Sequence, residues 1–420
     1  MNESTPGTGG HRSGIWTLAV LFSIDVTVFM DRAALAAVLL PIERRFELSD
    51  TAAGFLIAAF SVSYCVALPV VGWLADRIPR PYVLAGGVGL WGLMSLATGL
   101  AQSWEQLLIA RCLTGIGEAT CAPLGPAVIA DHFPPRQRNR ALAFLFLAIP
   151  VGSALGYLVG AQATLWLDWR FAFFCSGALG VAAAGLALTL GEADQPPECP
   201  SDAISSFEAW KGLLGERRFV LTTIGMAFLV FALMGWNAWA PTFLTAVRGM
   251  SLDDAGMALG VIVALAGVGG ATLGGWLGDR LHRRGPGATM ALVAATTCMA
   301  VPCFAAALWA PSALLLLGGL GLGLTLVFFN VGPLDAVLIS ITSPRARGRA
   351  LALNVLVIHL LGEMPAPWVV GIFSDLTGTL RSGLAFALAV LLIAGVLFWL
   401  AAGVLLLGFR QRGPRPTAHA

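Results

Sequence analysis

Twelve long stretches of mostly apolar residues, separated by short polar breaks, cover most of this 420-residue chain. Each stretch is long enough for a membrane-spanning helix, which needs about 20 apolar residues. The stretches lack the strict alternation of barrel strands. We therefore expect an all-α membrane protein with twelve transmembrane helices. The stretches lie approximately at residues 15–40, 51–75, 82–101, 105–131, 138–161, 169–190, 219–247, 253–279, 287–307, 311–341, 347–373 and 382–409.

The longest polar break divides the chain into two sets of six helices and is rich in Pro, Asp, Glu and Ser, as linkers are. A short surface helix is expected inside it, over residues 206–214. The predicted organisation is a cytoplasmic tail at 1–14, a six-helix bundle at 15–190, a cytoplasmic linker at 191–218, a second six-helix bundle at 219–409 and a cytoplasmic tail at 410–420.

The two halves share a loop motif. Gly72-Trp-Leu-Ala-Asp76-Arg77-Ile-Pro-Arg80 follows the second apolar stretch, and Gly275-Trp-Leu-Gly-Asp279-Arg280-Leu-His-Arg283 follows the eighth. The repeat predicts two six-helix bundles related by pseudo-symmetry, an architecture of many secondary transporters. The Asp and Arg side chains can pair and cap helix ends, and Asp131 is the expected partner of the first copy. Plain topogenic charge is the alternative interpretation of these loops.

Composition supports the membrane assignment, because 57% of the residues are hydrophobic and 11% are charged, with a mean hydropathy of +0.82. Soluble domains carry about 25% charged residues. Seven cysteines are too sparse for a disulfide scaffold, and none has metal-ligand spacing. The basic residues are too scattered for a nucleic-acid interface. No cleavable signal peptide is visible, so the first apolar stretch is expected to remain as a span.

Lys and Arg side chains set the predicted topology. With a cytoplasmic N-terminus, 18 of the 25 basic residues fall on the cytoplasmic side and five on the other. This asymmetry predicts that both termini are cytoplasmic in a multi-pass protein of the plasma (inner) membrane.

Ionisable residues inside the predicted spans are the main candidates for function, since each costs at least ~2.5 kcal/mol at the centre of a bilayer. Asp31 and Arg32 lie in the first stretch, and Arg111 and Glu118 lie on one face of the fourth. Arg offers a planar fork suited to phosphate or carboxylate, so both arginines are candidates for binding an anionic headgroup. Asp31 and Glu118 are candidates for substrate binding and proton coupling. The alternative is a salt-bridge cluster that only fixes helix packing.

Further proton-coupling candidates are Asp25, lower in the first stretch, and the pair His359 and Glu363, which lie one turn apart in the eleventh. His titrates near neutral pH, so a relay is conceivable. A single hydrogen bond across a helix interface is an equal alternative for His359. Asp335 lies in the tenth stretch, beside Gly332 and Pro333. Pro150 and Pro241 predict kinks, and Gly-rich segments predict close helix contacts.

No cofactor is expected. The Gly-x-Gly patterns follow no strand and precede no Walker lysine, which excludes a nucleotide loop. We see no nucleophile–base pair or metal set for an enzyme. A proton gradient is the expected driving force.

Several segments resemble the Spinster lysolipid and sphingosine-phosphate transporters of the major facilitator superfamily. They are Met30-Asp31-Arg32, the loop that begins at Gly72, Arg111-Cys-Leu-Thr-Gly115-Ile-Gly117-Glu118-Ala119, Ala148-Ile-Pro150-Val-Gly152-Ser-Ala-Leu-Gly156-Tyr157 and His359-Leu-Leu-Gly362-Glu363-Met-Pro365-Ala-Pro367. The resemblance implies the major facilitator fold, with Asp31, Arg32, Arg111 and Glu118 lining a central cavity and coupling protons to an amphipathic anionic lipid. It also implies that the Gly72–Arg80 and Gly275–Arg283 loops, with Asp131, act as a conformational gate.

The leading hypothesis is thus a proton-coupled secondary transporter that moves a lysophospholipid or sphingosine-phosphate-like lipid by alternating access. A carrier of a small organic anion or of a drug is the alternative, and a non-transporting receptor is a third. We expect a monomer in the membrane bilayer, with no nucleic-acid partner.

Overall fold

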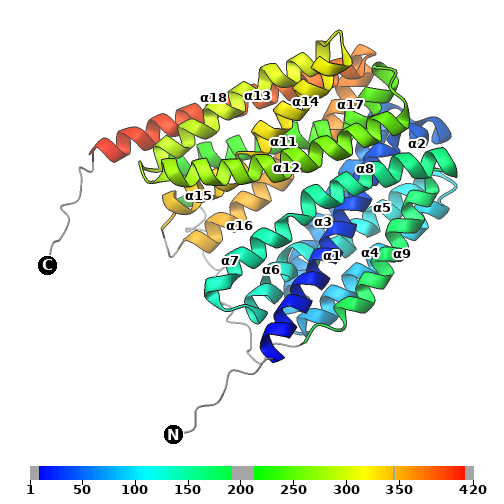
Figure 1. Cartoon of the computed structure of the whole chain (residues 1–420), viewed down its shortest axis with the longest axis horizontal. Helices are drawn as coiled ribbons and strands as arrows, with labels where there is room; N and C mark the ends of the chain where they lie inside the picture. The colour runs from blue at the N-terminus through cyan, green and yellow to red at the C-terminus, as the bar shows by residue number, and fades with distance from the viewer. Residues whose placement is uncertain (1–8, 192–211, 344–345, 412–420) are drawn as a thin grey trace, which may run out of the picture. The chain divides into compact units, whose positions relative to one another are not determined.

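A computed structural model describes residues 9–191, 212–343 and 346–411, and within them it is helical with no strands (Figure 1). Residues 1–8 and 412–420 of the expected tails, and 192–211 of the expected linker with most of its surface helix, lie outside the described residues. The first helix begins at Gly9, inside the stretch expected as a tail.

Nine helices form the N-terminal half of the described chain. They are α1 (Gly9–Ala37), α2 (Leu39–Phe46), α3 (Asp50–Ala75), α4 (Arg80–Leu100), α5 (Trp104–Glu118), α6 (Cys121–His132), α7 (Pro135–Phe146), α8 (Ala148–Trp166) and α9 (Arg170–Ala187). The C-terminal half holds α11 (Arg217–Thr242), η1 (Phe243–Val247), α12 (Leu252–His282), α13 (Pro286–Trp309), α14 (Ala313–Phe328), α15 (Val331–Ile341), α16 (Arg347–Ile358), η2 (His359–Glu363), α17 (Pro365–Thr377) and α18 (Leu380–Gln411).

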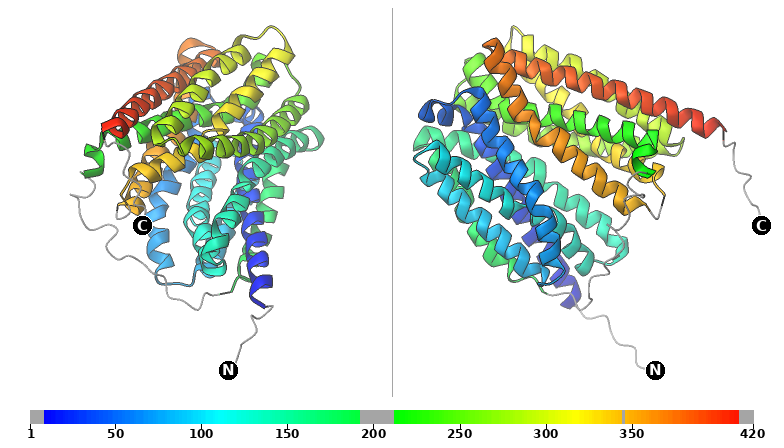
Figure 2. Two further views of the ribbon diagram at one scale, coloured as in Figure 1. Left: turned by 60° about the vertical axis from the view of Figure 1, so that its left-hand side comes forward. Right: turned by 180° about the vertical axis from the view of Figure 1, so that it is seen from behind.

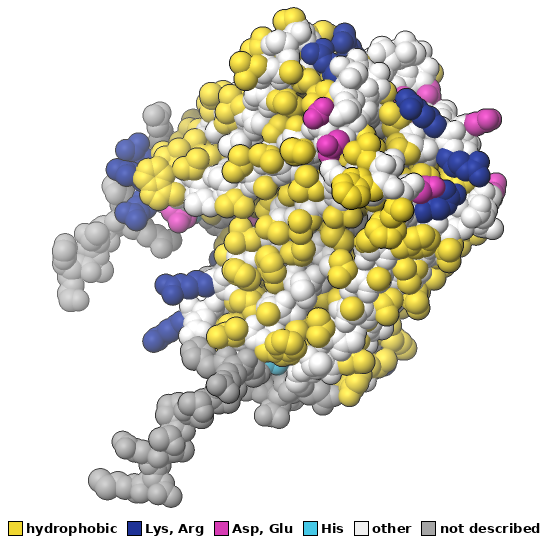
Figure 3. Space-filling model, turned by 45° about the vertical axis from the view of Figure 1, so that its right-hand side comes forward, with side chains coloured by type: hydrophobic (Ala, Val, Ile, Leu, Met, Phe, Trp, Pro, Cys, Tyr) yellow, Lys and Arg dark blue, Asp and Glu magenta, His cyan; other side chains and the backbone are white. Residues whose placement is uncertain are grey.

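Eleven helical segments of the described chain are long and apolar enough to cross a membrane. With α1, which has 29 residues, they make twelve long segments. This confirms the predicted twelve-helix fold class. On the face shown in Figure 3, hydrophobic side chains spread widely over the surface, and charged side chains gather in a few patches.

The two halves repeat the same irregular spans. The segments 104–132 and 313–341 have 29 residues each, and 136–166 and 347–377 have 31 residues each. The first two are each interrupted by a two-residue break, at Ala119–Thr120 and at Phe329–Asn330. Equal lengths and equal breaks support the duplicated unit predicted from the loop motif.

Proline explains the irregularities near positions 150, 241 and 365. A proline has no N–H to donate to the carbonyl four residues earlier, so a regular α-helix cannot continue through it. The kink predicted from Pro150 is present as the break at Leu147 between α7 and α8. The π-helix η1 follows Pro241, and the π-helix η2 ends just before Pro365. In both π-helices the backbone bonds bridge five residues, as from Met364 N–H to the carbonyl of His359 at 3.0 Å.

Glycines let α1 pack directly on α8 in the N-terminal half. A Cβ on Gly152 would lie 2.4 Å from the carbonyl oxygen of Val26, and one on Gly156 would lie 2.3 Å from that of Met30. On the other side of the bundle, a Cβ on Gly115 of α5 would lie 2.3 Å from the carbonyl oxygen of Phe60 in α3. Small residues of this kind let membrane helices approach closely. Two charged positions of α1 are thereby held at a fixed depth, beside α5.

Packing divides the chain into two compact units. One holds the N-terminal half together with Ala240–Val261, and the other holds the rest. Ala240–Val261, which the sequence places in the second bundle, is grouped with the first unit. A Cβ on Gly256 would lie 2.8 Å from the carbonyl oxygen of Tyr157, which shows how closely the start of α12 packs on α8. In the second unit, α13 runs beside α18 along much of its length (Figures 1 and 2).

Candidate functional site

The innermost part of the candidate site is a buried ion pair between Asp31 of α1 and Arg111 of α5. Arg111 Nη1 donates to Asp31 Oδ2 at 2.8 Å, and the two side chains are 1% and 0% exposed. The second carboxylate oxygen, Oδ1, accepts hydrogen bonds from Ser95 of α4 and Ser176 of α9, each at 2.6 Å. The guanidinium also lies over the ring of Phe173, 5.9 Å from its centroid. Asp31 thus ties four helices of one bundle together.

A second ion pair joins the same two helices. Arg32 Nε donates to Glu118 Oε2 at 2.7 Å. Glu118 is fully buried, but 27% of the Arg32 side chain is exposed. The other oxygen, Glu118 Oε1, is buried and has no hydrogen-bond partner among the described residues. This pair can therefore take a proton at Oε1 without first breaking another hydrogen bond.

Three aromatic rings surround the guanidinium of Arg32. Its central carbon lies 4.5 Å from the ring centroid of Phe60, 5.4 Å from that of Phe29 and 5.8 Å from that of Tyr64. Phe29 belongs to α1, and the other two rings belong to α3. Aromatic faces attract a guanidinium within about 6 Å. The rings hold Arg32 in place and form an apolar surface beside its exposed edge.

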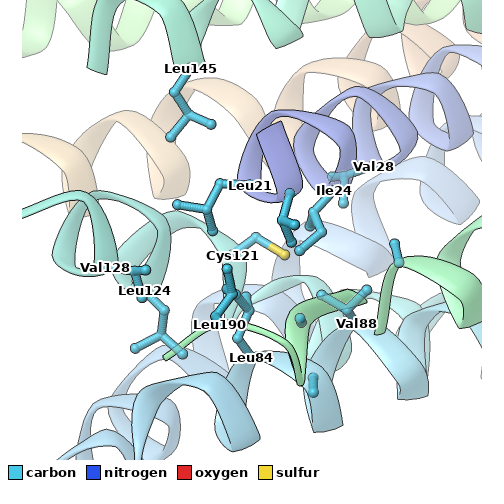
Figure 4. Close-up of a cluster of buried hydrophobic side chains, with 14 of the residues drawn as sticks. Leu21, Ile24, Val28, Leu84, Val88, Cys121, Leu124, Val128, Leu145 and Leu190 are labelled. Atoms are coloured by element: carbon cyan, nitrogen blue, oxygen red, sulfur yellow. The ribbon is translucent and has the colours of Figure 1, made fainter. Parts of the chain in front are cut away.

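Asp25 lies two turns before Arg32 on α1, half-buried, and makes no hydrogen bond or ion pair within the described chain. It interacts electrostatically with Arg32 and Glu118. Ile24 and Val28, on either side of it in sequence, belong to a buried apolar cluster that also contains Cys121 of α6 (Figure 4). This cluster packs the first half of α1 against α6.

The structure changes one part of the sequence-based picture. All four charged side chains were expected to line one cavity, but they form two separate pairs, and three of the four are almost fully buried. Asp31 and Arg111 pair with each other inside the bundle, and Arg111 Nε has no hydrogen-bond partner among the described residues. The cause of this internal pairing is the position of Ser95 and Ser176, whose hydroxyl groups complete an internal site for the Asp31 carboxylate. Arg32 alone among the four keeps substantial exposed surface.

In the second half, His359 and Glu363 do face each other, as their spacing predicts. His359 Nδ1 lies 2.6 Å from Glu363 Oε2, and the two side chains are 20% and 17% exposed. They occupy the two ends of the π-helix η2. Asp335 is exposed on α15 and forms no ion pair in the described part of the chain.

The first copy of the loop motif is braced as expected. Arg80 at the start of α4 forms an ion pair with Asp131 near the end of α6. Arg77 Nη1 donates to the carbonyl of Trp73 at 3.1 Å, and its guanidinium lies 4.1 Å from that indole ring. Asp76 is exposed, and a Cβ on Gly72 would meet no atom within 4 Å.

The second copy differs because no acidic residue corresponds to Asp131. Arg280 lies 5.9 Å from the ring of Trp276, which repeats the Arg77–Trp73 contact at a longer distance. Asp279, Arg280 and Arg283 line a polar hollow of about 440 Å³ and make no ion pair among the described residues. The two loops are thus alike in sequence but differ in their contacts.

Sequence reasoning missed the partners that complete these sites. Ser95 and Ser176 looked like ordinary small residues of their spans, and so did Asn330. Asn330 accepts from Thr296 Oγ1 at 2.6 Å and donates to Thr297 Oγ1 at 3.1 Å in the second unit. Polar residues at mid-span are a signal for such contacts, but one sequence does not say which helices face each other.

Long apolar helices with ion pairs buried among them are typical of multi-pass membrane carriers. Comparisons with known proteins identify this chain further. The profile of the Major Facilitator Superfamily matches residues 21–362. Protein spinster of Drosophila melanogaster is 32% identical over 387 residues, which cover 87% of this chain and 62% of that protein. Protein spinster homolog 3 of Danio rerio is 32% identical over 401 residues, covering 89% and 80%.

The chain belongs to the Major Facilitator Superfamily and, within it, to the Spinster family of transporters. It spans less than two thirds of the Drosophila relative. The crystal structure of a bacterial homologue of the human lysosomal transporter Spinster has a TM-score of 0.81 at 24% identity and covers 94% of this chain and 98% of its own. A D-xylose–proton symporter has a TM-score of 0.70 at 20% identity, covering 93% and 96%. At these identities the two structures show the shared fold.

Proposed function

We propose that this transporter moves an amphipathic anionic lipid, a lysophospholipid or sphingosine-phosphate-like molecule, by proton-coupled alternating access. The observation that carries the proposal is the partly exposed Arg32, paired with a buried carboxylate and surrounded by three aromatic rings. A guanidinium suits a phosphate group. The rings supply an apolar surface beside it for the first part of an acyl chain.

Proton coupling follows because Glu118 and the anionic substrate compete for Arg32. When Glu118 is ionised, it holds the guanidinium by a charge-assisted hydrogen bond. When a proton binds at Oε1, the charge on Glu118 is lost, and Arg32 is freer to bind an anion. We therefore expect anion affinity to rise as the pH falls. Asp25 lies close enough to sense both charges and is the secondary proton site.

Asp31 and Arg111 act in this proposal as the fixed support that places Arg32. Asp31 already neutralises the charge of Arg111. Arg111 therefore helps to place Arg32 and does not itself contact the substrate. His359 and Glu363 form a second protonatable pair, in the other half of the protein. We place both termini in the cytoplasm and the protein in the plasma (inner) membrane, on the distribution of Lys and Arg.

Proton-driven uptake into proteoliposomes tests the function. Radiolabelled lysophospholipid, sphingosine phosphate and gluconate are offered with and without an imposed pH gradient. We expect gradient-dependent uptake of a lipid. Uptake of gluconate alone would establish the small-anion carrier, and binding without uptake under any gradient would establish the receptor.

Arg32→Met is expected to reduce lipid uptake at least tenfold, because Arg32 is the one basic residue of the two buried ion pairs that keeps exposed surface. Arg32→Lys should retain part of the activity, since it keeps the charge and loses the planar fork. The matched control is Arg44→Met on α2, an exposed arginine outside the ion pair. Equal uptake by Arg32→Met and the control would contradict the assignment.

The Gly72–Arg80 and Gly275–Arg283 loops are proposed as the conformational gate. Asp131→Asn should slow uptake several-fold by loosening the ion pair with Arg80, yet change stability little, since partly exposed pairs are worth about 0–1 kcal/mol. The measurement is the initial uptake rate beside the unfolding temperature. Reversing the pair, with Arg80→Asp and Asp131→Arg together, should recover most of the rate. If the double variant folds but its uptake rate stays low, the effect belongs to Asp131 alone and not to the ion pair.

A further inference from the structure

A long apolar groove runs along the outside of the N-terminal unit. It has a volume of about 880 Å³ and is lined by α3, α4 and the end of α5, with all of its lining residues in this one unit. These three helices run alongside one another (Figure 2). The lining stripe on α3 extends from Phe55 to Leu74, roughly 28 Å at 1.5 Å per residue. This length is close to the roughly 30 Å hydrocarbon core of a bilayer.

The groove is suited to hydrocarbon and not to a polar solute. Its lining is apolar apart from Ser63, Cys112, Thr120 and the exposed Tyr82. Ser63 donates to the carbonyl of Phe60 at 2.8 Å, and Thr120 donates to that of Gly117 at 2.9 Å. Both hydroxyl protons are used inside their own helices, so a polar ligand would find few partners. Buried polar groups of a ligand need such partners.

The side chains along the rim are exposed although the helices are membrane spans. Val62, Val66 and Val70 of α3 all lie in the lining and are more than 40% exposed. The segments 50–75 and 80–100 are both apolar enough to cross a membrane. These exposed apolar side chains are suited to contact with the acyl chains of bilayer lipids.

An arginine, Arg77, lies next to one end of the groove in sequence but is not itself part of the lining. Leu74 and Ile78 line the groove, and Arg77 lies between them in sequence at the end of α3. The Arg77 guanidinium is exposed and stacked on Trp73 at 4.1 Å. An arginine stacked on an aromatic ring at a membrane end suits a lipid phosphate.

We propose that this groove is a binding site for one resident bilayer phospholipid, with an acyl chain along α3 and α4 and the phosphate at Arg77. The site is separate from the ion pairs at Arg32, and the inference goes beyond the proposed transport function.

Gly86 of α4 provides a direct test. It lines the groove, and a Cβ there would meet no atom within 4 Å, so a larger side chain fills the groove without a clash with the protein. Gly185 of α9 is the matched control, because its Cβ would also meet nothing within 4 Å and it lies outside the groove. Both changes replace glycine within a helix, so both are expected to fold.

The experiment uses the full chain in proteoliposomes with a phosphatidylglycerol that carries a photoreactive diazirine on its acyl chain, followed by mapping of the labelled peptides. We expect labelling concentrated on α3, α4 and Cys112, reduced at least fivefold by Gly86→Phe and unchanged by Gly185→Phe. Arg77→Met should lower labelling by the phospholipid but not by a diacylglycerol probe of the same chain.

Three outcomes would overturn the site. They are wild-type labelling in Gly86→Phe, labelling spread evenly over all lipid-facing spans, and displacement of the probe by lysophospholipid at micromolar levels, which would make the groove a cargo site. If Gly86→Phe does not fold, Gly86→Leu serves with the same expected direction. The labelling does not depend on transport, so its result is distinguishable from failure of the proposed function.

Discussion

In the Arg111→Met variant, the free energy of unfolding is expected to fall by about 3–5 kcal/mol, the usual cost of removing one partner of a buried ion pair. The change leaves the Asp31 carboxylate fully buried, with only the hydroxyl groups of Ser95 and Ser176 to stabilise its charge. The measurement is thermal unfolding of purified protein in detergent, beside the yield of folded protein.

Two further variants give this prediction its control. Asp31→Leu combined with Arg111→Met removes both charges, and it should recover much of the lost stability because no charge is left buried alone. Asp168→Asn breaks a pair with Arg170 in which the carboxylate is half exposed, and should cost about 0–1 kcal/mol. If Arg111→Met unfolds at the same temperature as Asp168→Asn, the pair is not the structural tie that its burial indicates.

The Glu118→Gln variant is expected to lose gradient-driven uptake, at least tenfold, while it remains folded and still binds the anion. Gln keeps an oxygen that can accept the hydrogen bond from Arg32 Nε but cannot take up a proton. It resembles the protonated state permanently. Anion binding, which in the wild type should strengthen as the pH falls, should therefore become independent of pH. The measurements are uptake under an imposed gradient and binding at pH 5.5 and 7.5.

Glu105→Gln is the matched control, since Glu105 is an exposed carboxylate in the first turn of the same helix, α5. It should behave as the wild type in both assays. Substrate-induced proton movement, followed with a trapped pH dye, gives an independent measurement. Persistent proton-driven uptake in Glu118→Gln would move the coupling to Asp25 or to the His359–Glu363 pair.

The sequence predicts which charged side chains belong to the candidate site, but it does not predict which of them form ion pairs. Asp31, Arg32, Arg111 and Glu118 stand out because charge is rare within an apolar span. Nothing in their spacing says that Arg32 pairs with Glu118 and Arg111 with Asp31. The pairing depends on the relative rotation and depth of α1 and α5. Gly152 and Gly156 bring α8 close to α1, and Gly115 brings α5 close to α3. The internal site for Asp31 also needs two serines, from α4 and α9, far apart in the chain.

The pattern of apolar and polar residues by itself determined that the chain spans a membrane with twelve long helices in two related halves. Span length and helical hydrogen bonding are local properties in lipid, where each helix satisfies its own backbone. Only the tertiary structure decided that Arg111 is neutralised inside the bundle while Arg32 keeps an exposed edge. That difference comes from side-chain packing between helices, and packing is a property of the assembled bundle which no single span carries.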